Sequence, residues 1–195
     1  ITGTPIKNGE DIDNARCAML VGRNPQAADP SQWMALKRLK QRGGRIIVID
    51  PLRNPAADIA DLYLQPRPNT DAALALSIAH LLIRSGRHDK AFVERWCHGF
   101  DAFAARAAEY PPERAAKLTG VPTPEIERAA DLYADGPSVF IPGHGIDAFS
   151  NGVQTFRAYD CLVAISGNLH RAGGNRLARR PKGMRTYLDL LHDPA

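Results

Sequence analysis

The chain has 195 residues, with 25 Lys and Arg against 21 Asp and Glu, and a formal net charge of +4. Its hydrophobic share of 44% and charged share of 24% are those of a globular protein. They exclude a disordered, collagen-like or coiled-coil chain. No apolar run approaches the roughly 18 residues of a membrane span, so we expect no direct membrane insertion. Because the chain opens on Ile1 and not on Met, we expect it to be a piece of a longer protein.

The positive charge is confined to the C-terminal end of the chain. Residues 1–170 hold 19 basic and 19 acidic side chains, so they are neutral as a whole. The excess comes from Arg171, Arg176, Arg179, Arg180, Lys182 and Arg185. A neutral body that lacks a pattern of interleaved aromatic and basic residues argues against a nucleic-acid partner.

The chain contains three cysteines, Cys17, Cys97 and Cys161, and none lies near another in the sequence. An odd number without close spacing argues against a disulfide framework and against a cysteine metal cluster. We therefore expect reduced thiols with structural roles.

In chain order, the first elements form a strand–helix–strand unit. Residues 17–21 and 44–50 are short apolar runs, which are typical of buried strands. Between them, residues 30–42 carry apolar positions at helical spacing, with Asp29 placed as the N-cap and Pro30 at the first helical position. A helical crossover of this kind makes the two strands parallel.

Strands and helices go on alternating through the rest of the chain. The expected elements are a strand at 61–65, a helix from Asp71 to Gly86, helices from Asp89 to Asp135 that break between Gly120 and Thr123, a strand at 138–142 and a helix at 151–166. This order predicts one compact α/β domain with about four short, mostly parallel strands.

In open parallel sheets, ligands bind beyond the carboxyl ends of the strands. The candidate residues there are Gly22, Asn24 and Pro25 after the first strand, Asp50 and Arg53 after the second, Arg67 and Asp71 after the third, and Gly143, His144 and Gly145 after the fourth. Glycine allows close backbone approach, and a carboxylate can accept hydrogen bonds from ribose hydroxyls or a purine edge. This set is typical of a dinucleotide site.

Purely structural roles remain open for each candidate. Gly22 and Asn24 have the composition of a turn, and Asp50 before Pro51 can simply end a strand. A carboxylate at Asp71 can stabilise a helix N-terminus by about 0.3–1 kcal/mol. The sequence contains neither G-x-G-x-x-G nor the phosphate-binding G-x-x-x-x-G-K-[ST] at these strand ends, which disfavours an ordinary NAD site.

Six segments, taken together and in order, resemble the dimethyl sulfoxide reductase family of molybdopterin oxidoreductases. They are Gly22-x-Asn24-Pro25, Ile49-Asp50-Pro51 with Arg53, residues 64–76 with Arg67 and Asp71, Thr119 to Pro122 with Ile126, Gly143-x-Gly145-Ile146, and Ser166 to Leu169 with Gly173 and Gly174. The likeness runs from about Ile12 to Gly174 with family-like spacing.

The resemblance implies a Rossmann-like three-layer domain, with helices on both faces of the sheet, that binds molybdopterin guanine dinucleotide with molybdenum or tungsten. It places Gly22 and Asn24 against the phosphate and pterin, Asp50 and Arg53 against the guanosine, Asp71 against the guanine edge, Gly143 and Gly145 where backbone passes the cofactor, and Gly167 and Asn168 at the return toward the central cavity. The expected domain covers residues 1–174, and residues 175–195 form a basic tail toward the next domain.

The resemblance also implies parts of a parent enzyme that these residues do not contain. The metal ligand and the cysteines of a 4Fe-4S cluster lie upstream in the family, and a further domain follows. We therefore assign no catalytic residue and no metal ligand here. Implied partners are the other domains and an iron–sulfur electron-transfer subunit, and the implied reaction is oxygen-atom or hydride and electron transfer.

A cofactor-free scaffold is the alternative function. A large iron–sulfur electron-transfer subunit can keep this fold while its strand-end residues serve structure alone. Retention of Asp50, Arg53 and Asp71 together argues against this alternative.

Overall fold

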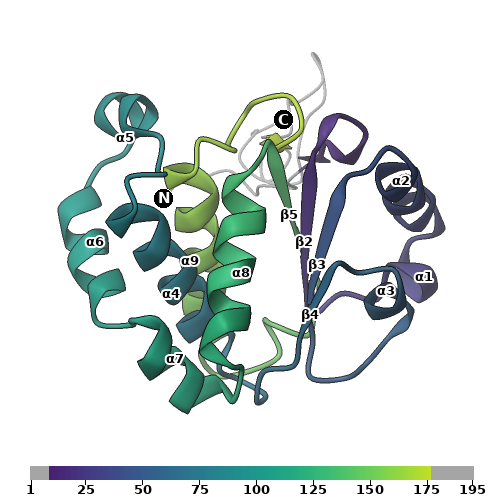
Figure 1. The fold of residues 1–195 in the computed structure, drawn as a ribbon, viewed down its shortest axis with the longest axis horizontal. Helices are drawn as coiled ribbons and strands as arrows, with labels where there is room; N and C mark the ends of the chain where they lie inside the picture. Colours follow the sequence, from purple (N-terminus) through teal and green to yellow (C-terminus); the bar gives the residue numbers. More distant parts are fainter. Residues whose placement is uncertain (1–8, 177–195) are drawn as a thin grey trace, which may run out of the picture.

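A computed structural model describes residues 9–176, and its centre is a four-stranded sheet between two layers of helices (Figure 1). The strands are β2 (Cys17–Val21), β3 (Arg45–Ile49), β4 (Leu62–Leu64) and β5 (Ser138–Pro142). They lie in the order β4-β3-β2-β5, and every pairing in this sheet is parallel. The predicted α/β fold class is confirmed.

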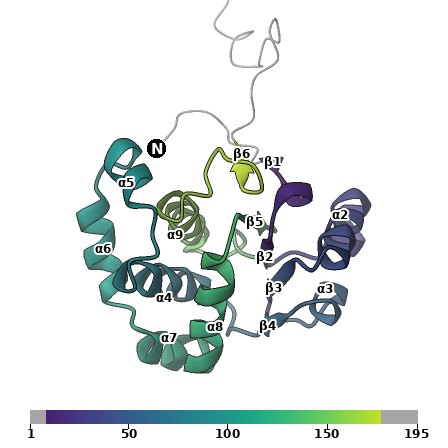
Figure 2. The same cartoon turned by 45° about the horizontal axis from the view of Figure 1, so that its top comes forward.

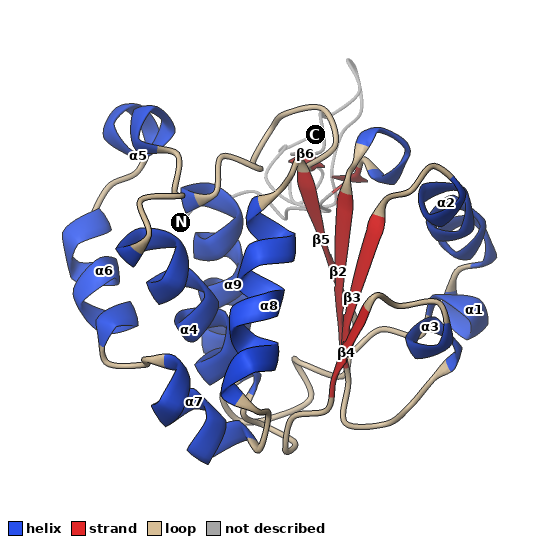
Figure 3. Cartoon of the chain, viewed as in Figure 1, coloured by secondary structure: helices blue, strands red, loops and turns tan. Residues whose placement is uncertain are grey.

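Strands β2, β3 and β5 bury both of their faces, because alternate side chains point into two separate cores. Leu20 and Val48 pack in the smaller core, under α2 (Pro30–Gln41) and α3 (Pro55–Asp58). Met19 and Ile47 pack in the larger core, under α4 (Asp71–Arg84), α8 (Thr123–Ala134) and α9 (Gly152–Ile165). Figure 3 shows these two helical layers on opposite sides of the sheet.

The segment expected to be helical from Asp89 to Asp135 consists of four helices. They are α5 (Lys90–Trp96), α6 (Phe100–Ala108), α7 (Pro112–Thr119) and α8. The break at Gly120 and the new start at Thr123 are confirmed, but two further breaks occur. Gly99 has a left-handed φ of 77°, and Pro111 is extended, so neither continues a helix.

Several elements are too short to show a periodic pattern in the sequence, so they were not predicted. These are β1 (Gly9–Glu10), a 3-10 helix η1 (Ile12–Asn14), α1 (Pro25–Ala28), α3 and β6 (Asn175–Arg176). β1 and β6 pair antiparallel and bring the two ends of the described chain side by side (Figure 2). The expected tail thus begins with a strand, and its other cations, Arg179, Arg180, Lys182 and Arg185, lie outside the described residues.

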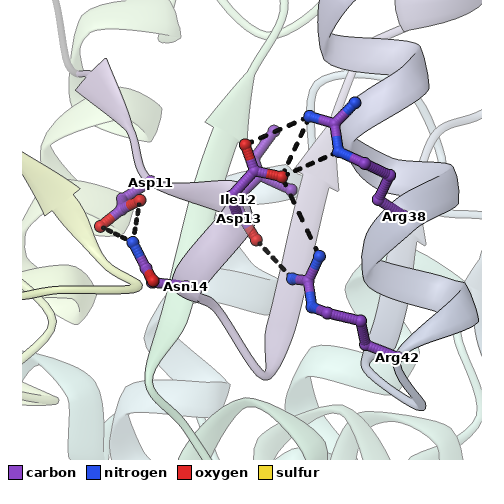
Figure 4. Close-up of polar contacts among 6 residues, drawn as sticks. All are labelled: Asp11, Ile12, Asp13, Asn14, Arg38 and Arg42. Carbon is purple, nitrogen blue, oxygen red and sulfur yellow. Dashed lines mark hydrogen bonds and ion pairs between the residues drawn. The ribbon is translucent and has the colours of Figure 1, made fainter.

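Charged contacts attach η1 to α2 just before the chain enters β2 (Figure 4). The Asp13 carboxylate accepts hydrogen bonds from Nε and Nη2 of Arg38 at 3.1 and 3.0 Å. Arg42 donates from Nη2 to the carbonyl oxygen of Ile12 at 3.1 Å. These groups are largely solvent-exposed, so the contacts contribute little to the free energy of unfolding.

Among residues 9–176, no helix combines the length and apolar character that crossing a membrane requires. Cys17, Cys97 and Cys161 all carry free thiols, and Cys17 is buried inside the sheet.

Candidate functional site

The order of the strands reverses between β2 and β5. β3 and β4 continue on one side of β2, whereas β5 lies on the other. In open α/β sheets, ligands bind beyond the carboxyl ends of the strands at such a point. A pocket of about 460 Å³ opens there, lined by Glu10, Arg23, Asp29, Gln32, Pro142, Gly143, His144, Asp147, Phe156 and Asp160.

Three of the predicted glycines bring the loops after β2 and β5 into backbone contact. Gly22 has a left-handed φ of 58°, and its carbonyl oxygen accepts from the N–H of Gly145 at 3.4 Å. A Cβ added to Gly143 would lie 1.9 Å from the same oxygen. Glycine is required at these positions because the two loops touch, and this contact leaves their backbone close to the pocket.

Asn24 and Pro25 form the start of α1, directly after the loop at Gly22. Asn24 is the N-cap residue, but its side chain makes no capping hydrogen bond. Its Oδ1 atom is buried and accepts no hydrogen bond from the described residues. Because an unpaired buried acceptor costs about 1–3 kcal/mol, this oxygen is suited to a donor from a ligand.

Asp50 and Arg53 lie in the loop after β3 and differ in burial and in partners. The Asp50 carboxylate is half-buried, and burial raises its pKa, although hydrogen bonds from Leu52 and Asn54 oppose this. Arg53 forms an ion pair with Asp58 at 2.9 Å, so its guanidinium is already partnered.

Asp71 is the first residue of α4, and its carboxylate is almost fully buried, with 6% of the residue exposed. Burial raises its pKa to about 6, and the negative charge of Asp50 acts in the same direction. Within residues 9–176, the one hydrogen bond that opposes this shift comes from its own backbone amide. The carboxylates that follow the second and third strands are thus close enough to interact electrostatically.

Two predicted residues lie at the opposite end of β5, beside its first residue, Ser138. The side-chain oxygen of Asn168 accepts from the N–H of Ser138 at 3.0 Å. A Cβ on Gly167 would meet the Asp89 carboxylate at 2.3 Å. The structure therefore does not bring Gly167 and Asn168 to the carboxyl edge of the sheet.

Arg67 and His144 remain near the carboxyl edge, but with different surroundings. Arg67 donates from Nη1 to the carbonyl oxygens of Lys117 and Leu118, at 2.9 and 3.2 Å, and so caps the end of α7. The His144 side chain is 96% exposed on the pocket rim, with Nδ1 3.2 Å from a carboxylate oxygen of Asp147. Of the two, His144 is the one that lines the pocket.

Two residues at this edge were not predicted as site residues. Arg23 lines the pocket, where its guanidinium is held by Gln32 at 2.9 Å and by Asp29 at 3.7 Å. Asn54 contacts both the Asp50 carboxylate and the backbone of Arg23. The available signals were the position of Arg23 directly after Gly22 and the Asn-Pro pair at a helix start. In residues 9–176, no group of three or more His, Cys, Asp or Glu side chains is arranged to hold a metal ion.

The chain is similar to several known proteins. The model of the molybdopterin oxidoreductase family matches residues 1–185. Probable oxidoreductase YyaE of Bacillus subtilis is 36% identical over 84% of this chain, and formate dehydrogenase H of Escherichia coli is 34% identical over 82%. The chain covers 25% and 22% of their lengths.

A solved structure has the same fold. Acetylene hydratase from Pelobacter acetylenicus superposes with a TM-score of 0.78 and 33% identity, over 83% of this chain and 23% of that one. The chain therefore spans about a quarter of the proteins it matches. Taken together, the family match, the sequence identities and the shared fold show that this chain belongs to the molybdopterin oxidoreductase family.

Proposed function

We propose that this chain is the domain that binds a molybdopterin guanine dinucleotide within a larger molybdenum or tungsten oxidoreductase. The observation that carries the proposal is Asp71, a buried carboxylate with a raised pKa at the carboxyl edge of the sheet. A guanine base offers two adjacent N–H donors, and a carboxylate that accepts both is compensated for its burial.

The surrounding residues fit the rest of such a nucleotide. Asp50 is available to the guanosine, and Gly22 and Gly145 expose backbone beside the pocket. The unpaired Oδ1 of Asn24 can accept from the pterin, which carries N–H donors. Arg23 supplies a positive charge near the pyrophosphate. These residues bind and orient the cofactor.

When bound, the pterin-held metal supplies the chemistry of oxygen-atom or hydride and electron transfer. Acetylene hydratase is about as similar to this chain as formate dehydrogenase H is, although their names describe different reactions. The domain therefore serves binding, and the choice of reaction belongs to other parts of the parent enzyme. Those parts include the metal ligand, a 4Fe-4S cluster and an iron–sulfur partner subunit.

A cofactor-free scaffold is the competing function, and Asp71 argues against it. A buried carboxylate that receives no side-chain hydrogen bond within the described residues lowers stability. In a scaffold, nothing compensates for this lost stability. In a guanine site, the N–H donors of the base would compensate for it by binding the carboxylate.

The test is to replace Asp71 by Ala and by Asn in the full-length parent enzyme. Molybdenum and tungsten are measured in the purified protein, together with the guanosine monophosphate that acid hydrolysis of the pyrophosphate releases. We expect both to fall by roughly tenfold or more, since about 1–3 kcal/mol of binding is lost for each unmade hydrogen bond. Asp131→Asn, on the exposed face of α8, is the matched control.

Equal metal and nucleotide contents in the Asp71 variants and the wild type would contradict the assignment of Asp71. A wild-type parent that carries neither metal nor guanine nucleotide would support the scaffold.

A further inference from the structure

Asn54 connects the loop after β2 to the loop after β3. Its Nδ2 atom donates to Oδ2 of Asp50 at 3.0 Å and to the carbonyl oxygen of Arg23 at 3.4 Å. Its Oδ1 atom accepts from the N–H of Ala56 at 2.9 Å, so Asn54 is also the N-cap of α3. One side chain therefore holds a helix start, a carboxylate and a neighbouring loop.

The orientation of this side-chain amide is determined by its partners. The backbone N–H of Ala56 can only donate, so it must face the amide oxygen. The amide nitrogen then faces the Asp50 carboxylate and the Arg23 carbonyl, both of which can only accept when the carboxyl group is ionised. A flipped amide would lose all three contacts.

The Asp50 carboxylate is held at both of its oxygens. Leu52 donates its N–H to Oδ1 at 2.8 Å, and Asn54 donates to Oδ2. The hydroxyl of Tyr63 donates to the Asp50 carbonyl oxygen at 2.9 Å, which fixes the backbone as well. Each carboxylate oxygen keeps an acceptor site for a ligand, because an ionised carboxylate offers about four.

We propose that Asn54 is a positioning residue of the nucleotide site, which sets the Asp50 carboxylate and the Gly22–Arg23 loop in their binding arrangement before the nucleotide arrives. The inference rests on the proposed function, in which Asp50 contacts the guanosine. Groups that are already in place need not be ordered on binding, so the affinity rises without any new contact to the ligand.

Asn54→Asp separates this role from helix capping. Aspartate has the same shape and still accepts from the N–H of Ala56, and Asn and Asp are equally good N-caps. It has no donor for Asp50 or for the Arg23 carbonyl, and it places a second negative charge beside Asp50. Asn54→Ala removes both roles, and Asp89→Ala removes the cap of α5 at a distance from the site.

The experiment uses the full chain without cofactor, with guanosine diphosphate as the probe. Carbon-13 NMR follows the titration of the Asp50 carboxyl group, amide signals report on Gly22 and Arg23, and calorimetry gives the affinity for the probe. For Asn54→Asp we expect a higher Asp50 pKa, shifted Gly22 and Arg23 signals, and roughly tenfold weaker binding, with a thermal unfolding midpoint that is near that of the wild type at acid pH and falls below it as both carboxyl groups ionise. Asp89→Ala should lower the midpoint and leave the Asp50 titration and the affinity unchanged.

An unchanged Asp50 titration and unchanged affinity in Asn54→Asp would reduce Asn54 to a helix cap. A shifted titration with unchanged affinity would equally overturn a role in nucleotide binding. Failure of the wild type to bind guanosine diphosphate would count against the proposed function, whereas the Asp50 and Gly22–Arg23 signals would still decide whether Asn54 holds the two loops.

Discussion

The side-chain amide of Asn175 pairs with both backbone groups of Phe140. Its Nδ2 donates to the carbonyl oxygen at 2.7 Å, and its Oδ1 accepts from the N–H at 2.8 Å. Two residues earlier along β5, the N–H of Ser138 is bound by Asn168. Because β5 is the last strand of the sheet, these two amides replace a neighbouring strand and cover its open edge.

Asn175→Ala should therefore lower the free energy of unfolding by about 2–4 kcal/mol, since it leaves a buried donor and a buried acceptor unpaired. Denaturant titration followed by circular dichroism measures the change. Asn14→Ala, which removes only the exposed hydrogen bonds to the two Asp11 carboxylate oxygens, should change stability by less than about 0.5 kcal/mol. Equal effects of the two substitutions would show that the Asn175 amide does not cover the edge.

Asp71→Asn should make the cofactor-free chain more stable at pH 8. The folded-state pKa of this carboxyl is about 6 instead of 3.8, so stability is lost as the pH rises from 3.8 through 6 and ionises a buried group. A neutral amide escapes this loss, which corresponds to about 3 kcal/mol at pH 8 and shrinks toward pH 4. Thermal unfolding at both pH values measures it, and a stability difference independent of pH would refute the explanation.

Asp61 should stabilise the fold with the opposite pH dependence. Burial alone would raise its pKa, but hydrogen bonds from Lys40, the Ile46 N–H and Arg45 more than offset this, and the pKa is lowered. Asp61→Asn should cost about 1–3 kcal/mol at pH 7. The cost should disappear as the pH falls through the lowered pKa, because the wild-type carboxyl group is then neutral, as the amide of the variant is. Urea titrations at a series of pH values from 7 downward test this, and a cost that stays constant as the pH falls would contradict it.

The three cysteines should differ in reactivity toward iodoacetamide. Burial raises the pKa of Cys17 to about 12, and only 1% of its surface is exposed, so at pH 8 it has almost no reactive thiolate. Burial also raises the pKa of Cys97 and Cys161, but both are partly exposed. Mass spectrometry should find Cys97 and Cys161 alkylated in the native protein and Cys17 alkylated only after unfolding. Native labelling of Cys17 at the rate of Cys97 would contradict this.

Much of the fold follows from local signals. The apolar runs at 17–21 and 138–142 are strands β2 and β5 as predicted, and Asp29 caps α2 by accepting from the N–H of Gln32 at 3.0 Å. These predictions hold because strand periodicity and helix capping depend on neighbouring residues alone. The ribbon of β1 and β6 could not be predicted, because two-residue strands that are far apart in sequence show no pattern.

The candidate site was likewise predictable from the sequence only in part. The sequence by itself determined that polar residues and glycines follow each strand, and parallel strands necessarily place Asp50 and Asp71 at one edge of the sheet. Only the tertiary structure decided which internal partners each of them has. Arg67 turned to the end of α7, Asn168 bonded to β5, and Asn54 reached Asp50 and Arg23. Burial and the choice of hydrogen-bond partner depend on segments distant in sequence, and these meet only when the chain has folded.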